Sequence, residues 1–319
     1  MGAYAVKRLL LFVPTLILVS LLAFGVMRIL PGDPAIMVLI GLEGEGTYTP
    51  EELAETQRRL GTDKPLYEQY VRWVADAVRG DFGYSYFRNK AVSKELLERF
   101  PVTIQLTVMS LILAVVTAVP LGVVSAVYQD KWPDYAAKIF TVVGISLPTF
   151  WAGILIVFFL AQLFNWGAPL GYAKLWEDPL KNLSQLIFPA LSLGYFNMAF
   201  TARITRSAML EVLREDYIRT ARAKGLAESL VLVRHALRNA LLPVITVAGY
   251  QFGILLGGAV VTEDIFLVPG IGQALILALA TRDFNIIQAI VLVVGVFTVT
   301  LNLVVDILYG LINPRVRYA

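Results

Sequence analysis

Residues 101–129, PVTIQLTVMSLILAVVTAVPLGVVSAVYQ, contain no aspartate, glutamate, lysine or arginine. About 20 apolar residues are enough for a helix to cross the hydrocarbon core of a bilayer, so this stretch predicts a transmembrane helix. The rest of the chain has the same character, because 57% of its 319 residues are hydrophobic and only 16% are charged. A soluble domain is about 25% charged. The composition argues against a water-soluble enzyme and against a chain that binds nucleic acid.

Six uncharged runs are long enough to hold one transmembrane helix each. Besides residues 101–129, these are residues 9–27, 139–173, 182–202, 239–262 and 284–305. Residues 165–169, NWGAP, predict a turn, so the run 139–173 is expected to give one helix and a loop. Residues 265–281 leave only nine residues between Gly272 and Arg282, which is too short for a span. The sequence predicts an all-α polytopic membrane protein with six transmembrane helices and one re-entrant or surface helix.

The distribution of charge predicts the orientation. If residues 1–8, 129–138, 203–238 and 312–319 share one side, that side carries fourteen lysines and arginines against six acidic residues. The opposite side then carries thirteen basic and seventeen acidic residues. Short basic loops stay in the cytoplasm, whereas a long loop such as residues 30–100 is translocated largely regardless of its charge. Both termini are therefore expected to be cytoplasmic.

The domains follow from this orientation. They are residues 1–29, the first transmembrane helix; residues 30–100, an extracytoplasmic domain; residues 101–310, a five-helix core that includes a cytoplasmic segment at 203–238; and residues 311–319, a cytoplasmic tail.

Residue types that carry catalysis or bind metals are scarce. The chain has no cysteine and one histidine, which argues against disulfides, thiolate catalysis and a histidine-based metal site. It also lacks a G-x-x-x-x-G-K phosphate loop, so it cannot be an ATPase. An intramembrane protease would need paired catalytic groups at membrane depth, and His235 lies in the cytoplasmic segment. We expect neither a catalytic nor a metal-binding residue in this chain.

Residues 30–100 have the signals of a folded domain. Thr49, Pro50 and Glu52 predict a capping box at the start of a helix. Apolar residues from Leu66 to Ala77 recur at helical spacing, and Gly80 can end that second helix. The domain could cover the outer ends of the spans, or it could be a docking surface for an extracytoplasmic partner.

The cytoplasmic segment 203–238 predicts two short helices. An apolar stripe supports the first helix, which Gly225 is expected to stop; the stripe comprises Met209, Val212, Leu213, Tyr217 and Ala221. The second helix covers about residues 228–238 and continues toward Pro243 at the next span. A basic amphipathic helix could lie on anionic lipid. Because Gly225 and Pro243 hold segment 203–238 between two spans, this segment could instead transmit the motion of a partner into the membrane.

Several motifs recur in an order that resembles the permeases of ABC importers. The two most specific are DYIRTARAKGL at residues 216–226 and RHALRNALLP at residues 234–243. The others are LPGDP at 30–34, KPLYEQY at 64–70, GDFGYS at 80–85, ISLPTFW at 145–151, TRSAMLE at 205–211 and PGIG at 269–272. The chain resembles the B-type permease subunit of the dipeptide, oligopeptide and nickel group over nearly its whole length. The wider permease motif has Glu-Ala-Ala where this chain has Arg219, Thr220 and Ala221.

This resemblance implies a type I ABC importer permease fold in the prokaryotic plasma membrane, with an extracytoplasmic insertion after the first helix. Two homologous permease subunits, forming a heterodimer, would enclose the path. Two ATPases would bind ATP and magnesium, and an extracytoplasmic binding protein would deliver the cargo. The cargo would be a di- or oligopeptide, with glutathione and nickel as alternatives in the same group. An autonomous channel or secondary transporter is a further alternative.

The resemblance also implies roles for individual residues. The ATPase-coupling residues would be Asp216, Tyr217, Arg219, Thr220, Ala221, Arg222, Ala223, Lys224, Gly225 and Leu226. An outer gate or a plain turn would be formed by Pro269, Gly270, Ile271 and Gly272.

Polar and small residues within the spans add further candidates. Gln105, Asn197, Gln251 and Asn302 could line the path or bond one helix to another. Gly249, Gly253 and Gly257 repeat every fourth residue and could meet the partner permease or pack within this chain. Asp306 near the cytoplasmic end of the last span could be functional, or it could pair with a nearby arginine.

Overall fold

The computed structural model describes residues 2–29, 33–40, 47–168 and 171–312, and these are helical apart from one short hairpin and the connecting turns. The chain divides into two compact units, one of Met1–Val102 with Pro269–Ala319 and one of Thr103–Val268. The helix α5 (Val92–Val127) belongs to both units, because it begins in the first and continues in the second.

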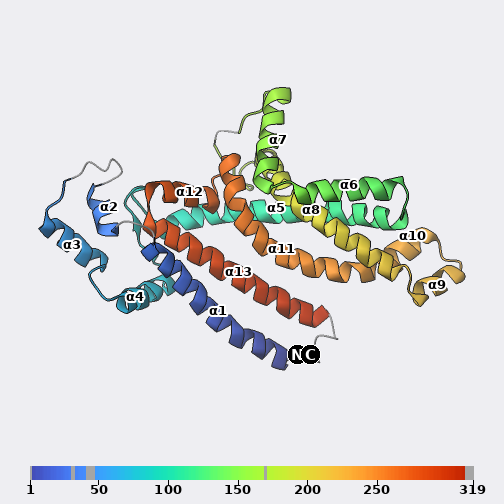
Figure 1. The fold of residues 1–319 in the computed structure, drawn as a ribbon, viewed down its shortest axis with the longest axis horizontal. Helices are drawn as coiled ribbons and strands as arrows, with labels where there is room; N and C mark the ends of the chain where they lie inside the picture. Colours follow the sequence, from blue (N-terminus) through green and yellow to red (C-terminus); the bar gives the residue numbers. More distant parts are fainter. Residues whose placement is uncertain (1, 30–32, 41–46, 169–170, 313–319) are drawn as a thin grey trace. The chain divides into compact units, whose positions relative to one another are not determined.

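The first unit is built on two long antiparallel helices, α1 (Gly2–Ile29) and α13 (Phe284–Ile312), which lie side by side (Figure 1). A Cβ atom at Gly295 of α13 would lie 2.5 Å from Cγ1 of Val19 of α1, so glycine permits this close approach. Arg8 and Asp306 form an ion pair of 2.8 Å between the same two helices. This pair confirms the predicted pairing of Asp306 with an arginine.

The smaller elements of this unit follow α1 along the chain or precede α13. They are α2 (Pro34–Ile40), α3 (Pro50–Leu60), α4 (Leu66–Val78), β1 (Tyr84–Ser85), β2 (Lys90–Ala91) and α12 (Ile271–Thr281). β1 and β2 form an antiparallel hairpin in which Tyr84 faces Ala91.

Two helices predicted within residues 30–100 are confirmed. The Thr49 side chain accepts a hydrogen bond from the Glu52 amide (3.2 Å), and the Glu52 carboxylate accepts one from the Thr49 amide (2.8 Å), which is the predicted capping box. In α4, Tyr70 and Trp73 pack against Phe24 of α1. Gly80 follows α4 with a φ of 81°. The domain is therefore attached to α1 by aromatic packing.

The second unit is centred on α8 (Pro179–Val212). Its other elements are the remainder of α5, α6 (Trp132–Ser146), α7 (Thr149–Phe164), α9 (Asp216–Ala223), α10 (Glu228–Leu230), the π-helix η1 (Val231–Leu237) and α11 (Arg238–Ile265). α6, α7 and α11 all pack against α8 (Figure 1). α8 has a long series of buried residues, about half of which are glycine, alanine, serine or threonine. Small residues let helix backbones approach closely, which is how helices associate in a membrane.

Among the described residues, five helices are long and apolar enough to cross a membrane, and a bent pair raises the number to six if it forms one span. The bent pair corrects the prediction for residues 139–173, because α6 and α7 are separate helices with axes 105° apart. The break lies at Leu147 and Pro148, since a residue before proline is disfavoured in the helical conformation. α12 has only 11 residues, as the sequence predicts for a segment too short to span.

The packing of α8 against α5 predicts a strong effect of one added methyl group. A Cβ atom at Gly194 would lie 2.7 Å from the carbonyl oxygen of Ser110. We expect Gly194→Ala to destabilise the purified protein by about 1–3 kcal/mol, because neither backbone can move away without disturbing the core. Thermal unfolding in detergent measures this change.

Gly25→Ala is the matched control, since a Cβ atom at Gly25 of α1 meets nothing within 4 Å. Equal unfolding temperatures for the two variants would contradict the close α5–α8 contact.

Candidate functional site

The segment between α8 and α11 forms a compact projection at one end of the second unit (Figure 1). In α9, Ile218 and Ala221 are buried against Met209 of α8 and against Val231 and Ala236 of η1. The opposite face of α9 is exposed to solvent. Most residues predicted to couple to an ATPase lie on this exposed surface: Asp216, Tyr217, Arg219, Thr220, Arg222, Ala223, Lys224 and Gly225. Ala221 and Leu226 instead belong to the apolar packing that supports it.

The predicted single helix from Met209 to Gly225 is wrong in one respect. α8 ends at Val212, and Glu215 is extended, with a φ of −68° and a ψ of 146°, before α9 begins. The Glu215 carbonyl then accepts a hydrogen bond from the Ile218 amide (3.1 Å). Asp216 lies in the first turn of α9, where a negative charge is favourable beside the free amides of the helix end. The break turns α9 away from the line of α8.

Gly225 forms the predicted elbow. It has a φ of 77°, and its amide bonds the Arg222 carbonyl at 2.9 Å while the Leu226 amide bonds the Ala221 carbonyl at 3.4 Å. A Cβ atom at Gly225 would meet nothing within 4 Å. The backbone conformation, rather than space, therefore requires glycine here.

Two polar contacts brace the elbow. The guanidinium of Arg222 binds both carboxylate oxygens of Glu228, with nitrogen–oxygen distances of 2.7 and 3.1 Å. The hydrogen bond to Glu228 raises the pKa of Arg222 above its ordinary value. Asn239 of α11 also donates to the Tyr217 hydroxyl of α9 (2.7 Å). This chain has Arg219 where the wider permease motif has glutamate, and its salt bridge at the elbow is instead formed by Arg222 and Glu228.

A buried aspartate near this projection was missed by the sequence reasoning. Asp134 of α6 is fully buried and receives both Nε (2.7 Å) and a terminal nitrogen (2.9 Å) of Arg206 from α8. Lys138 (2.9 Å) and the Ser125 hydroxyl (2.6 Å) contact the same carboxylate. The signal available in the sequence was the Asp134–Lys138 spacing of four residues, which is typical of a helical ion pair. This cluster fixes the α5–α6 turn against the helix that carries the projection.

The predicted path-lining residues have different surroundings. Gln105 forms a network with Asn182 and Tyr172, which favours a structural role. Asn197 lines an open cavity of about 530 Å³ that includes Ser146 and Thr149 from the α6–α7 bend.

The other two polar candidates differ from each other as well. The Gln251 carbonyl oxygen accepts a hydrogen bond from Thr201 (3.1 Å), whereas its buried amide nitrogen has no partner in the part of the chain that the structure describes. Asn302 is half-buried and belongs to the first unit, whereas the other three belong to the second.

The glycine repeat of α11 lies on a partly uncovered face. Gly257 is exposed, and a Cβ atom there would meet nothing within 4 Å. Gly249 and Gly253 are half-buried, whereas the adjacent Gly258 faces Leu193 of α8. Glu263 lies about two turns after Gly257 on the same helix. Its buried carboxylate accepts a hydrogen bond from the Thr103 hydroxyl (2.5 Å). The sequence reasoning did not predict this buried charge, because it considered only runs without charged residues.

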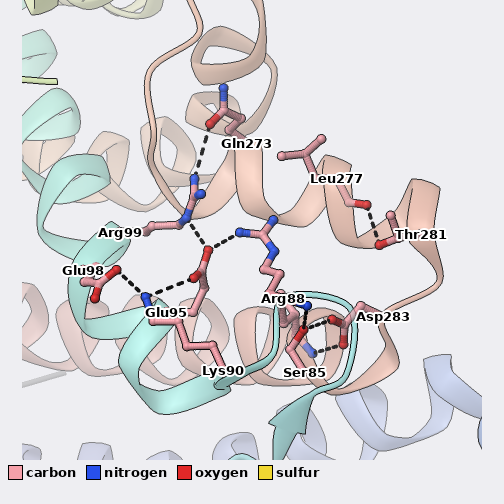
Figure 2. A network of polar contacts seen from close by, with 11 residues as sticks. Ser85, Arg88, Lys90, Glu95, Glu98, Arg99, Gln273, Leu277, Thr281 and Asp283 are labelled. Atoms are coloured by element: carbon pink, nitrogen blue, oxygen red, sulfur yellow. Dashed lines mark hydrogen bonds and ion pairs between the residues drawn. The ribbon is translucent and has the colours of Figure 1, made fainter. Parts of the chain in front are cut away.

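The predicted gate residues form the start of α12. Pro269 is half-buried, Gly270 is the N-cap, and Ile271 and Gly272 are buried. A polar network holds this helix to the hairpin and to the start of α5 (Figure 2). At its centre, Glu95 binds Arg88, Lys90 and Arg99.

The network is completed by two contacts to α12 and the residues that follow it. Arg99 reaches the side-chain carbonyl of Gln273 at 3.3 Å, and Ser85 donates to the buried carboxylate of Asp283. α12 is therefore tied to α5 near its start and to the hairpin just after its end.

Comparisons with known proteins cover the whole chain. Residues 118–318 match the family described as binding-protein-dependent transport system inner membrane component, and residues 1–107 match the N-terminal region of such membrane components. The dipeptide transport system permease protein DppB of Alkalihalophilus pseudofirmus is 40% identical, with 100% of each chain covered. The glutathione transport system permease protein GsiC of Escherichia coli strain K12 is also 40% identical, with 99% of each chain covered.

A solved structure shares the fold. The crystal structure of an amino acid ABC transporter with histidines matches 68% of this chain and 94% of its own, with a TM-score of 0.54 and 16% identity.

The Asp134 cluster predicts a sensitive site for stability. We expect Asp134→Asn to destabilise the protein by roughly 3 kcal/mol, because the Arg206 charge loses its buried partner. Thermal unfolding in detergent measures the loss.

Asp130→Asn is the matched control, since Asp130 is exposed and its φ of 59° is one that asparagine adopts readily. An equally large loss in both variants would rule out a special role for the Asp134 cluster.

Proposed function

The chain belongs to the family of binding-protein-dependent transport system inner membrane components, and from this premise we propose that it forms half of the path of an ATP-driven importer of short peptides. It is a multi-pass plasma-membrane permease and not itself the ATPase. The observation that carries the proposal is the braced projection of α9, Gly225 and η1, which offers a rigid surface to a cytoplasmic ATPase.

The proposed cargo is a di- or oligopeptide. Full-length similarity to a dipeptide permease and to a glutathione permease supports this choice, and glutathione is itself a tripeptide. Nickel transport is the second candidate within the group. The spans hold neither cysteine nor histidine, so a nickel ion would find no thiolate or imidazole ligand there.

The proposed topology has six spans, with both termini in the cytoplasm and residues 30–100 outside. In this arrangement α6 and α7 form one bent span, and the excess of basic residues lies on the cytoplasmic side. The projection then faces the cytoplasm, and the hairpin and α12 lie at the outer surface.

The proposed complex contains a second, homologous permease and two ATPases, which hold ATP and magnesium. One ATPase receives α9. Movement of the ATPase would pass from the exposed residues of α9 through the buried Ile218 and Ala221 to η1, α8 and α11. The brace between Arg222 and Glu228 lets the elbow move as one body.

Three further roles are proposed for the sites predicted from sequence. Asn197 and the unpartnered amide of Gln251 line the path, because they are the candidates of the second unit that keep hydrogen-bonding capacity, whereas Gln105 is committed to Asn182 and Tyr172. The exposed Gly257 face of α11 meets the partner permease. Residues 269–272 form an outer gate whose movement is limited by the Glu95 network.

A reconstituted transport assay tests the function. We expect labelled dipeptide to enter proteoliposomes only when this chain, its partner permease, the ATPases, the binding protein and ATP are all present. Uptake by this chain alone, independent of ATP, would contradict the proposal and favour a channel or secondary transporter.

The elbow predicts a mutant that separates assembly from transport. Gly225→Val should remain in the membrane and lose coupled uptake, because the left-handed backbone costs a side-chain-bearing residue about 1–2 kcal/mol and a β-branched residue more. Uptake and ATP hydrolysis are measured together, and we expect hydrolysis to persist while uptake falls.

Gly167→Val provides the control, since Gly167 also has open space around its Cβ position but lacks the positive φ. Normal uptake in Gly225→Val would show that the elbow conformation is not required.

A further inference from the structure

The first unit contains a cavity that none of the roles above uses. Its volume is about 510 Å³, within the usual range of about 300–1,000 Å³ for sites of small ligands. The walls come from α1, α2, α3, α4, the hairpin with the turn before it, and the start of α13. Aromatic rings of Trp73, Tyr84 and Tyr86 contribute to these walls.

Three arginines from separate parts of the chain line this cavity. Arg59 comes from α3, Arg72 from α4, and Arg282 from the turn between α12 and α13. Within the described ranges, none of these three guanidinium groups has an ion pair or a hydrogen bond. Arg88 and Arg99, by contrast, are committed to Glu95. The cavity therefore holds unneutralised guanidinium groups, which bind carboxylates through two parallel hydrogen bonds.

The backbone of Arg282 supports a role for its side chain. This residue ends α12 in the left-handed conformation, with a φ of 54°. Glycine or asparagine is the usual residue there, and an arginine adopts this conformation at an energetic cost. Strain of this kind concentrates at binding and functional sites.

The same cavity also presents carboxylates. Asp76 has one distant cationic neighbour, Arg79 at 3.8 Å, and Asp81 accepts one hydrogen bond from the Gly83 amide (2.9 Å). A carboxylate can accept about four hydrogen bonds, so both retain free acceptor capacity. Guanidinium groups and carboxylates in one cavity are complementary to a ligand that carries both charges.

We propose that this cavity binds a free short peptide by its two termini, with the carboxylate on the arginines and the ammonium group on Asp76 and Asp81. An extended dipeptide spans about 7 Å, which a cavity of this volume accommodates. The aromatic walls would accept apolar side chains of many kinds. The inference rests on the proposed peptide cargo and the outer location of residues 30–100, and it adds a holding site that the permease itself provides.

Direct binding tests the proposal without the binding protein. The full permease–ATPase complex in nanodiscs is titrated by equilibrium dialysis with labelled Ala-Phe, its C-terminal amide and its N-acetyl derivative. We expect Ala-Phe to bind, and each blocked derivative to bind about tenfold or more weakly, because each loses a charge-assisted contact. Absence of Ala-Phe binding, or equal binding of all three, would overturn the proposal.

Two variants assign the binding to the cavity. Arg59→Gln should weaken Ala-Phe binding about tenfold and reduce the discrimination against the amide. Its matched control is Arg58→Gln, on the same helix, because Arg58 does not line the cavity and bonds the Ala54 carbonyl. Arg282→Gly should weaken binding without lowering the unfolding temperature, since glycine relieves the backbone strain. Unchanged binding in both variants would overturn the assignment.

The outcomes are distinguishable from failure of the proposed function. If ATP-dependent peptide uptake occurs but Ala-Phe does not bind the complex, the cavity proposal is wrong and the function stands. If Ala-Phe binds but no uptake occurs under any condition, the importer proposal fails instead. If the unchanged complex does not bind free Ala-Phe, and the arginine variants no longer dock the binding protein, the proposal is overturned in favour of a protein-docking surface.

Discussion

Backbone polar groups that enter hydrocarbon must form their hydrogen bonds within the protein, and this constraint governs the fold. It explains why the described residues are helical apart from a small hairpin and the connecting turns. Interruptions of the long helices are therefore informative. Pro148 separates α6 from α7, and Gly225 separates α9 from α10. Each interruption lies where the chain must change direction and where a proline or a glycine makes the change inexpensive.

Close packing follows from the same environment. Lipid tails are as apolar as leucine, so helices gain little from burying large apolar surfaces against one another. The contacts instead use small residues, such as Gly194 against Ser110 and Gly295 against Val19. Packing of this kind holds α8 and α1 firmly to their own neighbours, and it leaves α9 supported by a separate apolar cluster around Ile218.

Charges are scarce, and two of the buried carboxylates lie at the centres of clusters of cations. Glu95 collects three cations beside α12, and Asp134 collects Arg206 and Lys138 beside the α5–α6 turn. Such clusters are costly to open, because a separated buried charge loses both water and partner. They fix the parts of each unit that adjoin the proposed gate and the proposed coupling surface, whereas Arg59, Arg72 and Arg282 have no ion pair among the described residues.

Much of the architecture could be predicted from sequence, because the hydrophobic runs and the local signals act over short distances. The uncharged runs predicted the long helices. Thr49 and Glu52 predicted the capping box at the start of α3, and Gly225 predicted the left-handed turn after α9. The same reasoning failed at residues 139–173, since a continuous uncharged run does not reveal that Pro148 bends it. The same reasoning predicted one helix from Met209 to Gly225, because the apolar stripe continues across Glu215. In the structure α8 ends at Val212, and a new helix begins after Glu215 with Asp216 in its first turn.

Most of the site was decided only by tertiary structure. Gln105 and Asn197 are equivalent as polar residues in a sequence, yet one is bonded to Asn182 and the other lines a cavity. Arg59 and Arg282 are separated by most of the chain and meet in one cavity, which no spacing rule anticipates. The sequence by itself determined a polytopic helical membrane protein, because periodicity and hydropathy are properties of neighbouring residues, whereas the proposed coupling role of residues 216–226 came from their resemblance to known permeases. The tertiary structure decided which charges are paired and which are left for a ligand, because pairing depends on distances between residues that are remote in the chain.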